Sequence, residues 1–162
     1  MSKRIDVAAV APLLGSLYPP PFDAPCRTRE RRRLGDEAGL TQFGVNLLRL
    51  APGSWSSQRH WHSHEDEFVY VLEGVVTLVS DAGEEELHAG DAAGFKAGER
   101  NGHSIQNRSA APAVLLEVGS RHPEQDVTTY PDVDLIAPAG SRPANFTRRD
   151  GTPYANVTRR SA

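Results

Sequence analysis

Residues 60–74 read His-Trp-His-Ser-His-Glu-Asp-Glu-Phe-Val-Tyr-Val-Leu-Glu-Gly, and this stretch decides the fold prediction. It contains three of the six histidines of the chain and leads directly into an apolar run. Side chains alternate between the two faces of an extended segment, so we expect His60, His62 and His64 to share one face. Imidazole groups gathered in this way are typical of a metal site.

A carboxylate stands at the start of the apolar run. In a strand, Glu67 shares a face with Val69 and Val71, and the run predicts a strand that is buried on both sides. An ionised carboxylate is costly to bury unless it is paired or coordinates a cation. The neighbouring histidines therefore suggest that Glu67 is a metal ligand.

A second histidine segment lies downstream. A turn at Gly90 and a glycine-rich loop over residues 96–102 lead to a predicted strand at residues 104–107. In that strand His103, Ile105 and Asn107 fall on one face.

Together the two segments resemble the cupin superfamily, which carries two motifs built from a His-x-His pair, a glutamate, a third histidine and fixed glycines. The resemblance covers roughly residues 41–120. The chain has four residues between His62 and Glu67, and a lysine, Lys96, at the position of a proline in the second motif. The spacers from Gly53 to His60 and from Gly98 to His103 are also longer than in the usual cupin pattern. The matching residues are Gly53, His60, His62, Glu67 and Gly74 in the first motif, and Gly90, Gly98, His103 and Asn107 in the second.

The resemblance implies one divalent transition metal inside a small β-barrel, bound by His60, His62, Glu67 and His103. Such ligands suit Mn, Fe, Co, Ni, Cu or Zn better than Ca or Mg, which prefer oxygen. His64 forms a second His-x-His pair with His62, and the sequence leaves open which pair binds. The longer spacing from His62 to Glu67 favours the first pair, with His64 at the rim or behind the ligands. Further candidates to contact the metal ligands or an anionic substrate are Arg49, Arg59, Lys96, Arg100, Asn101 and Asn107.

The whole chain fits one domain of 162 residues, with 14 glycines and 12 prolines between short apolar runs. We therefore predict an all-β fold, either a closed barrel (double-stranded β-helix) or a two-sheet jelly roll, with a pocket at one mouth. The expected strands are residues 41–50, 54–62, 67–72, 75–79, 84–88, 91–95, 104–107 and 114–118.

The two ends of the chain lack strand alternation and are expected to be irregular. Residues 1–40 are predicted to form an N-terminal arm, in which residues 7–17 form a short helix or lie along the barrel wall. The basic run at residues 27–33 is interpreted as a solvated or salt-bridged part of this arm. Residues 121–162 are predicted to be a C-terminal wrapping segment, in which residues 130–135 either cover the barrel or stay exposed.

Composition limits the partners and the compartment. The net charge of −3 argues against a general nucleic-acid binder, and no stretch approaches the roughly 18 apolar residues of a membrane span. A single cysteine, Cys26, excludes an intrachain disulfide and fits a reducing compartment. Asp6 and Pro12 interrupt the one apolar segment that has the length of a signal peptide, so we do not expect secretion. We expect a cytoplasmic protein, and a homodimer because cupins of this size often pair and the outward row Phe68, Tyr70 and Leu72 needs cover.

The resemblance implies a small-molecule ligand at the metal, and three functions stay open. The first is a dioxygenase-like or oxidoreductase-like enzyme that acts on a small oxygen-rich organic molecule. The second is a metal-dependent isomerase or decarboxylase. The third is a non-catalytic binding or sensing module, since a fold alone does not specify catalysis.

Overall fold

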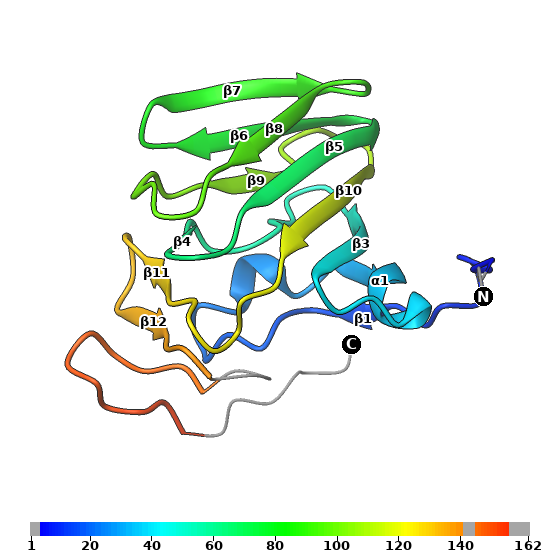
Figure 1. The fold of residues 1–162 in the computed structure, drawn as a ribbon. Coiled ribbons are helices and arrows are strands. Elements are labelled where there is room, and N and C mark those ends of the chain that lie inside the picture. Colours follow the sequence, from blue (N-terminus) through cyan, green and yellow to red (C-terminus); the bar gives the residue numbers. More distant parts are fainter. Residues whose placement is uncertain (1–3, 141–144, 156–162) are drawn as a thin grey trace.

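The computed structural model describes residues 4–140 and 145–155 and is built almost entirely of β-strands (Figure 1). The predicted all-β class is therefore confirmed. The strands are β1 Leu13–Leu14, β2 Glu30–Arg33, β3 Phe43–Leu50, β4 Trp61–His62, β5 Glu67–Glu73, β6 Val75–Ser80, β7 Gly83–His88, β8 Ala92–Phe95, β9 Ser104–Gln106, β10 Ala113–Ser120, β11 Thr128–Tyr130 and β12 Leu135–Ala137. Two short helices, η1 Ala24–Cys26 and α1 Leu34–Ala38, flank β2.

The strands form three antiparallel sheets. The large sheet has the order β1-β2-β3-β10-β5-β8, and a smaller sheet of order β7-β6-β9 belongs to the same β-sandwich. A third sheet, β12-β11-β4, lies at one end (Figure 1). The sheets do not close into a continuous barrel, so the observed architecture is the jelly roll of the two predicted alternatives.

The main core lies between the large and the small sheet. Leu48, Val71 and Leu115 from the large sheet and Val76 and Ile105 from the small one are at most 2% exposed. Burying one such side chain stabilises the fold by about 1.5–3 kcal/mol. This core fixes the two sheets relative to each other.

The same inner face changes chemistry further along the strands. The paired residues Leu48 and Leu115 are followed, two positions on, by the pair Asn46 and Glu117. The next inward pair is Gly44 and Gly119, which have no side chains to fill the space. Polar and small residues thus replace the aliphatic core at this end, and a cavity opens there.

One motif glycine is required by the backbone. Gly74 joins β5 to β6 with a φ of 82°, a left-handed conformation that glycine adopts readily. A Cβ at this position would also lie 2.9 Å from the carbonyl oxygen of Pro112. The tight turn between β5 and β6 therefore depends on glycine for two reasons.

The strand predicted over residues 54–62 is wrong for most of its length. Only Trp61–His62 forms a strand, and Trp55 and His60 make isolated bridges to Gln106 and His103. The reason is that serine hydroxyls take over backbone partners: Ser56 Oγ accepts from the Ile105 N–H, and Ser104 Oγ donates to the Ser57 carbonyl. The segment therefore follows β9 without a regular ladder.

The N-terminal arm contains more regular structure than expected. Residues 7–17 form no helix, because Leu13–Leu14 pair as β1 with β2. The basic run enters the large sheet as β2, which pairs with β3 through contacts such as Arg31 opposite Leu48. Of the two expectations for this run, solvated or salt-bridged, the second is confirmed, since Arg27, Arg31 and Arg33 form ion pairs.

The C-terminal segment also adds strands, β11 and β12, and packs against the N-terminal arm. Tyr18 and Cys26 from the first segment form a second buried cluster with Tyr130, Leu135 and Phe146 from the second. Figure 1 shows the two ends, in blue and in orange, on the same side of the sandwich. Residues 130–135 are therefore not an exposed tail, and the part of the prediction beyond residue 155 lies outside the described residues.

No helix in residues 4–140 or 145–155 is long and apolar enough to cross a membrane.

Candidate metal centre and its cavity

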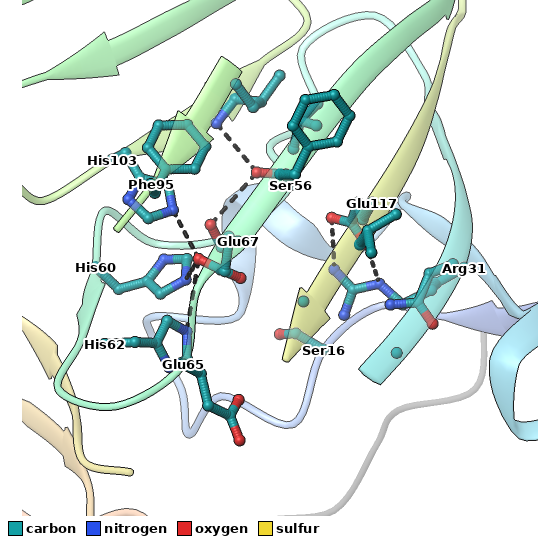
Figure 2. Close-up of a pocket in the computed structure, with 18 of the residues that line it drawn as sticks. Ser16, Arg31, Ser56, His60, His62, Glu65, Glu67, Phe95, His103 and Glu117 are labelled. Carbon is teal, nitrogen blue, oxygen red and sulfur yellow. Dashed lines mark hydrogen bonds and ion pairs between the residues drawn. The ribbon is translucent and has the colours of Figure 1, made fainter. Parts of the chain in front are cut away.

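Four side chains from three segments of the chain meet at one end of the sandwich. His60 and His103 are held opposite each other because each backbone N–H donates to the other residue's carbonyl, at 3.0 and 2.9 Å. His62 lies on β4, and Glu67 is the first residue of β5. Figure 2 shows the three imidazoles around the Glu67 carboxylate.

The distances place one carboxylate oxygen at the centre of this cluster. Oε2 of Glu67 lies 2.8 Å from Nε2 of His103, 3.3 Å from Nε2 of His60 and 3.6 Å from Nε2 of His62. The donor atoms of His60, His62 and Glu67 all lie within 4.8 Å of one another. The structure therefore brings together the four residues that the cupin motifs suggested.

Hydrogen bonds behind the rings fix two of the imidazoles. Nδ1 of His60 donates to the Gln58 carbonyl at 2.9 Å, and Nδ1 of His62 donates to Asp126 Oδ2 at 2.6 Å. A proton on Nδ1 leaves Nε2 as a lone-pair donor, which is the usual arrangement of a metal-binding histidine. His103 is held differently, because its ring stacks on Phe95 and its buried Nδ1 has no hydrogen-bond partner among the described residues.

The charges of the cluster shift its pKa values. Burial alone would raise the pKa of Glu67, but His62 and His60, with the hydrogen bond from His103, hold it well below its ordinary value. Burial would likewise lower the pKa of His62, yet Glu67 and Asp126 outweigh it and raise that pKa. The pKa of His103 is lowered, chiefly by burial. Glu67 is thus kept ionised beside the three rings.

This donor set fits a divalent transition metal. Three imidazoles and one carboxylate are borderline ligands, and two of the rings already direct lone pairs toward the carboxylate. A second set of possible ligands consists of His62, Glu65 and Asp126, whose ligand atoms also lie within 4.8 Å of one another. Both oxygens of Asp126 accept hydrogen bonds, from His62 Nδ1 and the His64 N–H, and Oε1 of Glu65 accepts from the His122 N–H. The first group is therefore the better cation site.

The cluster faces a cavity of about 290 Å³. Glu65 and Glu67 line the cavity near the histidines, and Figure 2 shows Arg31 and its partner Glu117 across the cavity from His60 and His62. A smaller hollow of about 40 Å³ adjoins the same cluster and is lined by Trp61 and Lys96. A small polar molecule can therefore approach the cluster through the larger cavity. The charged lining residues are Arg29, Arg31, Arg33, Arg121, Glu65, Glu67 and Glu117.

His64 is separated from the other histidines. Its side chain is exposed, Nδ1 lies 2.9 Å from Ser63 Oγ, and its backbone N–H donates to Asp126. His64 thus helps to hold Asp126 but lies outside the cluster around Glu67.

The remaining candidates lie mostly away from the cavity. Arg49 points from the outer face of β3 toward Glu30, 3.7 Å away, and Arg100 lies 5.7 Å from the Trp61 ring. Arg59 is paired with Asp132 and Asp81. Lys96 and Asn101 line only the small hollow.

Asn107 has a structural role. Its side-chain nitrogen donates to the carbonyls of Leu50 and Ala111, and its oxygen accepts from the backbone N–H and hydroxyl of Ser109. The side chain is fully buried and holds the loop between β9 and β10. It does not line the cavity.

Sequence reasoning missed several residues of the site. Asp126 and Tyr130, whose ring stacks on His60 at 5.7 Å, come from the C-terminal segment and carry no local signal. Glu65 stands within the histidine stretch but was not singled out. Arg29 and Arg31 did carry a signal, because a basic residue at every second position is the pattern of one face of a strand.

These features define a jelly-roll protein with a histidine–glutamate cluster at the mouth of a polar cavity. The family model of the cupin domain matches residues 46–119. A sugar phosphate isomerase from a cupin superfamily, from Silicibacter pomeroyi, is 44% identical, with a TM-score of 0.87 over 94% of this chain and 97% of that one. The chain therefore belongs to the cupin superfamily.

Two further relatives are more distant. A provisional sugar phosphate isomerase from Acidithiobacillus ferrooxidans is 31% identical, with a TM-score of 0.69 over 80% of this chain and 81% of that one. The tetracenomycin polyketide synthase protein TcmJ of Streptomyces glaucescens is 27% identical over 106 residues, which are 65% of this chain and 69% of TcmJ.

Proposed function

We propose that this protein is a metal-dependent isomerase that acts on a small phosphorylated sugar. The observation that carries the proposal is the cluster of His60, His62, His103 and Glu67 at the mouth of a cavity of about 290 Å³. That volume suits a small metabolite rather than a polymer. The similarity to the sugar phosphate isomerase from Silicibacter pomeroyi supports this reaction over the other open alternatives.

The reaction needs no external oxidant. An aldose–ketose isomerisation moves one hydrogen between neighbouring carbons and one proton between their oxygens, so the oxidation of one carbon balances the reduction of the other. A divalent metal held by the four ligands would act as a Lewis acid on the substrate oxygens. The chain's own groups must then transfer the proton between the carbons.

Glu65 is the residue we assign to this proton transfer. It is buried, lines the cavity beside His62, and lies outside the proposed ligand set. A carboxylate in a low-dielectric site is an effective general base when it lies within reach of the substrate carbon. Asp126 is less suited to this role, since it does not line the cavity and its carboxylate accepts hydrogen bonds from His62 and His64.

The test combines metal analysis with isotope exchange. Protein purified without chelator is expected to contain about one transition metal per chain, and to exchange deuterium from D2O into C1 or C2 of an aldose or ketose phosphate. His62→Ala and Glu67→Gln should lose both metal and exchange, and His64→Ala should keep both. Glu65→Gln should keep the metal and lose the exchange.

The same samples test the rival reactions. Substrate-dependent oxygen uptake without isomer formation would replace the proposal by the dioxygenase or oxidoreductase alternative. Release of CO₂ from a carboxylic acid substrate would replace it by the decarboxylase, and ligand binding without turnover by the non-catalytic module. The identity of the metal and the cytoplasmic location stay predictions.

A further inference from the structure

The basic strand β2 places alternate arginines on the inner face of the large sheet. Arg31 is paired with the core residue Leu48, whereas Arg32 is paired with Leu47 on the opposite face. Arg29 and Arg33 share the inner side with Arg31, and all three line the cavity. The run that resembles a solvated arm in the sequence thus forms one wall of the proposed substrate site.

The described residues leave part of the charge on this wall without an ion pair. Arg33 pairs with Asp36 at 3.4 Å, and Arg31 pairs with Glu117 at 2.9 Å. Arg29 is only 5% exposed, yet it makes no ion pair within the described part of the chain. Its Nε donates to the Gly15 carbonyl, which leaves Nη1 and Nη2 without hydrogen bonds to described residues.

A buried charge that makes no ion pair is costly. Burial, and next to it the charge of Arg31, lower the pKa of the Arg29 guanidinium, although the charge of Glu117 acts in the opposite direction. Glu117 occupies the Nε and Nη2 edge of Arg31, and Nη1 of Arg31 makes no hydrogen bond with a described residue. Three terminal nitrogens on this wall are therefore left for an anion.

We infer that Arg29 and Arg31 bind the phosphoryl group of the substrate, on the opposite side of the cavity from the histidine cluster. This inference rests on the proposed function for the identity of the substrate. Guanidinium groups present paired N–H donors that match phosphate oxygens, so two of them form a specific phosphate site. Arg33 and Arg121, which pair with Asp36 at the edge of this wall, would add positive charge at the entrance.

The spacing of the two sites fits a small sugar phosphate. β2 and β5 are separated by β3 and β10, which corresponds to three strand spacings, or about 14 Å between backbones. Arg31 and Glu67 both line the cavity on the inner face of this sheet. A substrate that reaches both therefore carries its phosphoryl group at one end of a short carbon chain and its metal-binding oxygens at the other.

The first test uses inorganic phosphate and metal-free protein, so that a metal cannot hold the anion. Calorimetric titration is expected to show one phosphate per chain. Arg29→Gln and Arg31→Gln should each weaken phosphate binding about tenfold or more, the loss expected for hydrogen bonds to a charged group. Arg32→Gln, on the outer face of the same strand, is the matched control and should bind phosphate like the wild type.

Folding is controlled by the melting temperature. Because Arg29 is buried and makes no ion pair with a described residue, Arg29→Gln should melt no lower than the wild type without phosphate and should lose the stabilisation that phosphate gives. Arg29→Lys keeps the charge without the paired donors and should bind phosphate more weakly than the wild type. Wild-type affinity for phosphate in Arg29→Gln, or no phosphate binding by the wild type, would overturn the inference.

Separate readouts distinguish this inference from the proposed function. If phosphate binding depends on Arg29 but no sugar phosphate is isomerised, the anion site stands and the isomerase proposal fails. If isomerisation occurs and Arg29→Gln leaves its KM unchanged, the anion site fails alone. A sugar acid of equal length that binds more tightly than the sugar phosphate would contradict the phosphoryl assignment.

Discussion

His62 is held between two carboxylates of different function. Nε2 faces Glu67 at 3.6 Å, and Nδ1 donates to Asp126 at 2.6 Å. Asp126 thereby fixes the orientation of the ring and the position of its proton, and the two negative charges together keep the imidazole basic. A basic, oriented imidazole is a strong metal ligand but also a better proton acceptor.

We expect this balance to appear in the pH dependence of metal binding. The raised pKa of His62 means that the metal-free protein takes up a proton there above pH 6.5, the ordinary value. Metal affinity should be full above the raised pKa and should fall as the pH decreases through it, while Glu67 stays ionised because its pKa is lowered. Competition of zinc with a chelator, measured from pH 8 to 5, checks this; an affinity that is constant down to the carboxylate range would contradict histidine ligation.

A second expectation concerns the hydrogen bond behind the ring. Asp126→Asn keeps the shape of the side chain but removes its charge, and it should lower metal affinity about 10–100-fold. The matched control is Asp132→Asn, which changes an exposed partner of Arg59 and should leave metal affinity unchanged. Equal affinities of the two variants in the same titration would show that Asp126 does not support the ligand.

At the scale of elements, the segment from His103 to Asn107 has two separate tasks. Its first residue enters the histidine cluster, and its last residue holds the loop that leads into β10. The paired bridge between His60 and His103 ties this segment to the first histidine. The residues on either side of β9 therefore connect the histidine cluster to the loop that supports β10.

Asn107→Ala should separate these tasks. It removes the side-chain donor to the buried Leu50 carbonyl and the acceptor of the half-buried Ser109 N–H, at a cost of roughly 1–3 kcal/mol for each group that water does not reach. We expect a clear loss of unfolding free energy in urea, with about one metal per chain still bound to the folded protein. Asn101→Ala, at an exposed asparagine, should change stability by less than about 0.5 kcal/mol. Loss of metal from folded Asn107→Ala would instead make Asn107 part of the site.

At the scale of the whole molecule, the outer face of the large sheet stays apolar. Phe68, Tyr70 and Leu72 on β5 are 43%, 37% and 42% exposed, so the strand predicted to be buried on both faces is buried on one. The register places Tyr70 beside Leu116 of β10 on this face. The described parts of the two arms leave these three residues exposed.

We therefore expect a homodimer that buries this face. Tyr70→Lys would place a charge in the centre of the interface, and light scattering should then report the monomer mass. Glu85→Lys, an exposed change on β7, is the charge control and should leave the dimer intact. A wild-type monomer at micromolar concentration would contradict the prediction, because the face of Phe68, Tyr70 and Leu72 would then not be covered by a second copy of the chain.

The sequence by itself determined the all-β class and most strand positions, because alternation fixes which side chains share a face and glycine marks the turns. The set of His60, His62, Glu67 and His103 came from the resemblance of two separate segments to the cupin motifs. The short strand at His62 was overestimated, since the competition of serine hydroxyls for backbone groups depends on a neighbouring strand.

Only the tertiary structure decided what surrounds the cluster. Asp126 reaches His62 across 64 positions in the sequence, and Arg31 reaches Glu117 across 86. Local periodicity can assign a face to a residue, but it cannot say which distant strand lies beside it or whether that face meets solvent or a cavity. The packing of both chain ends against the sandwich made this choice, and it turned a basic run into the wall of the proposed substrate site.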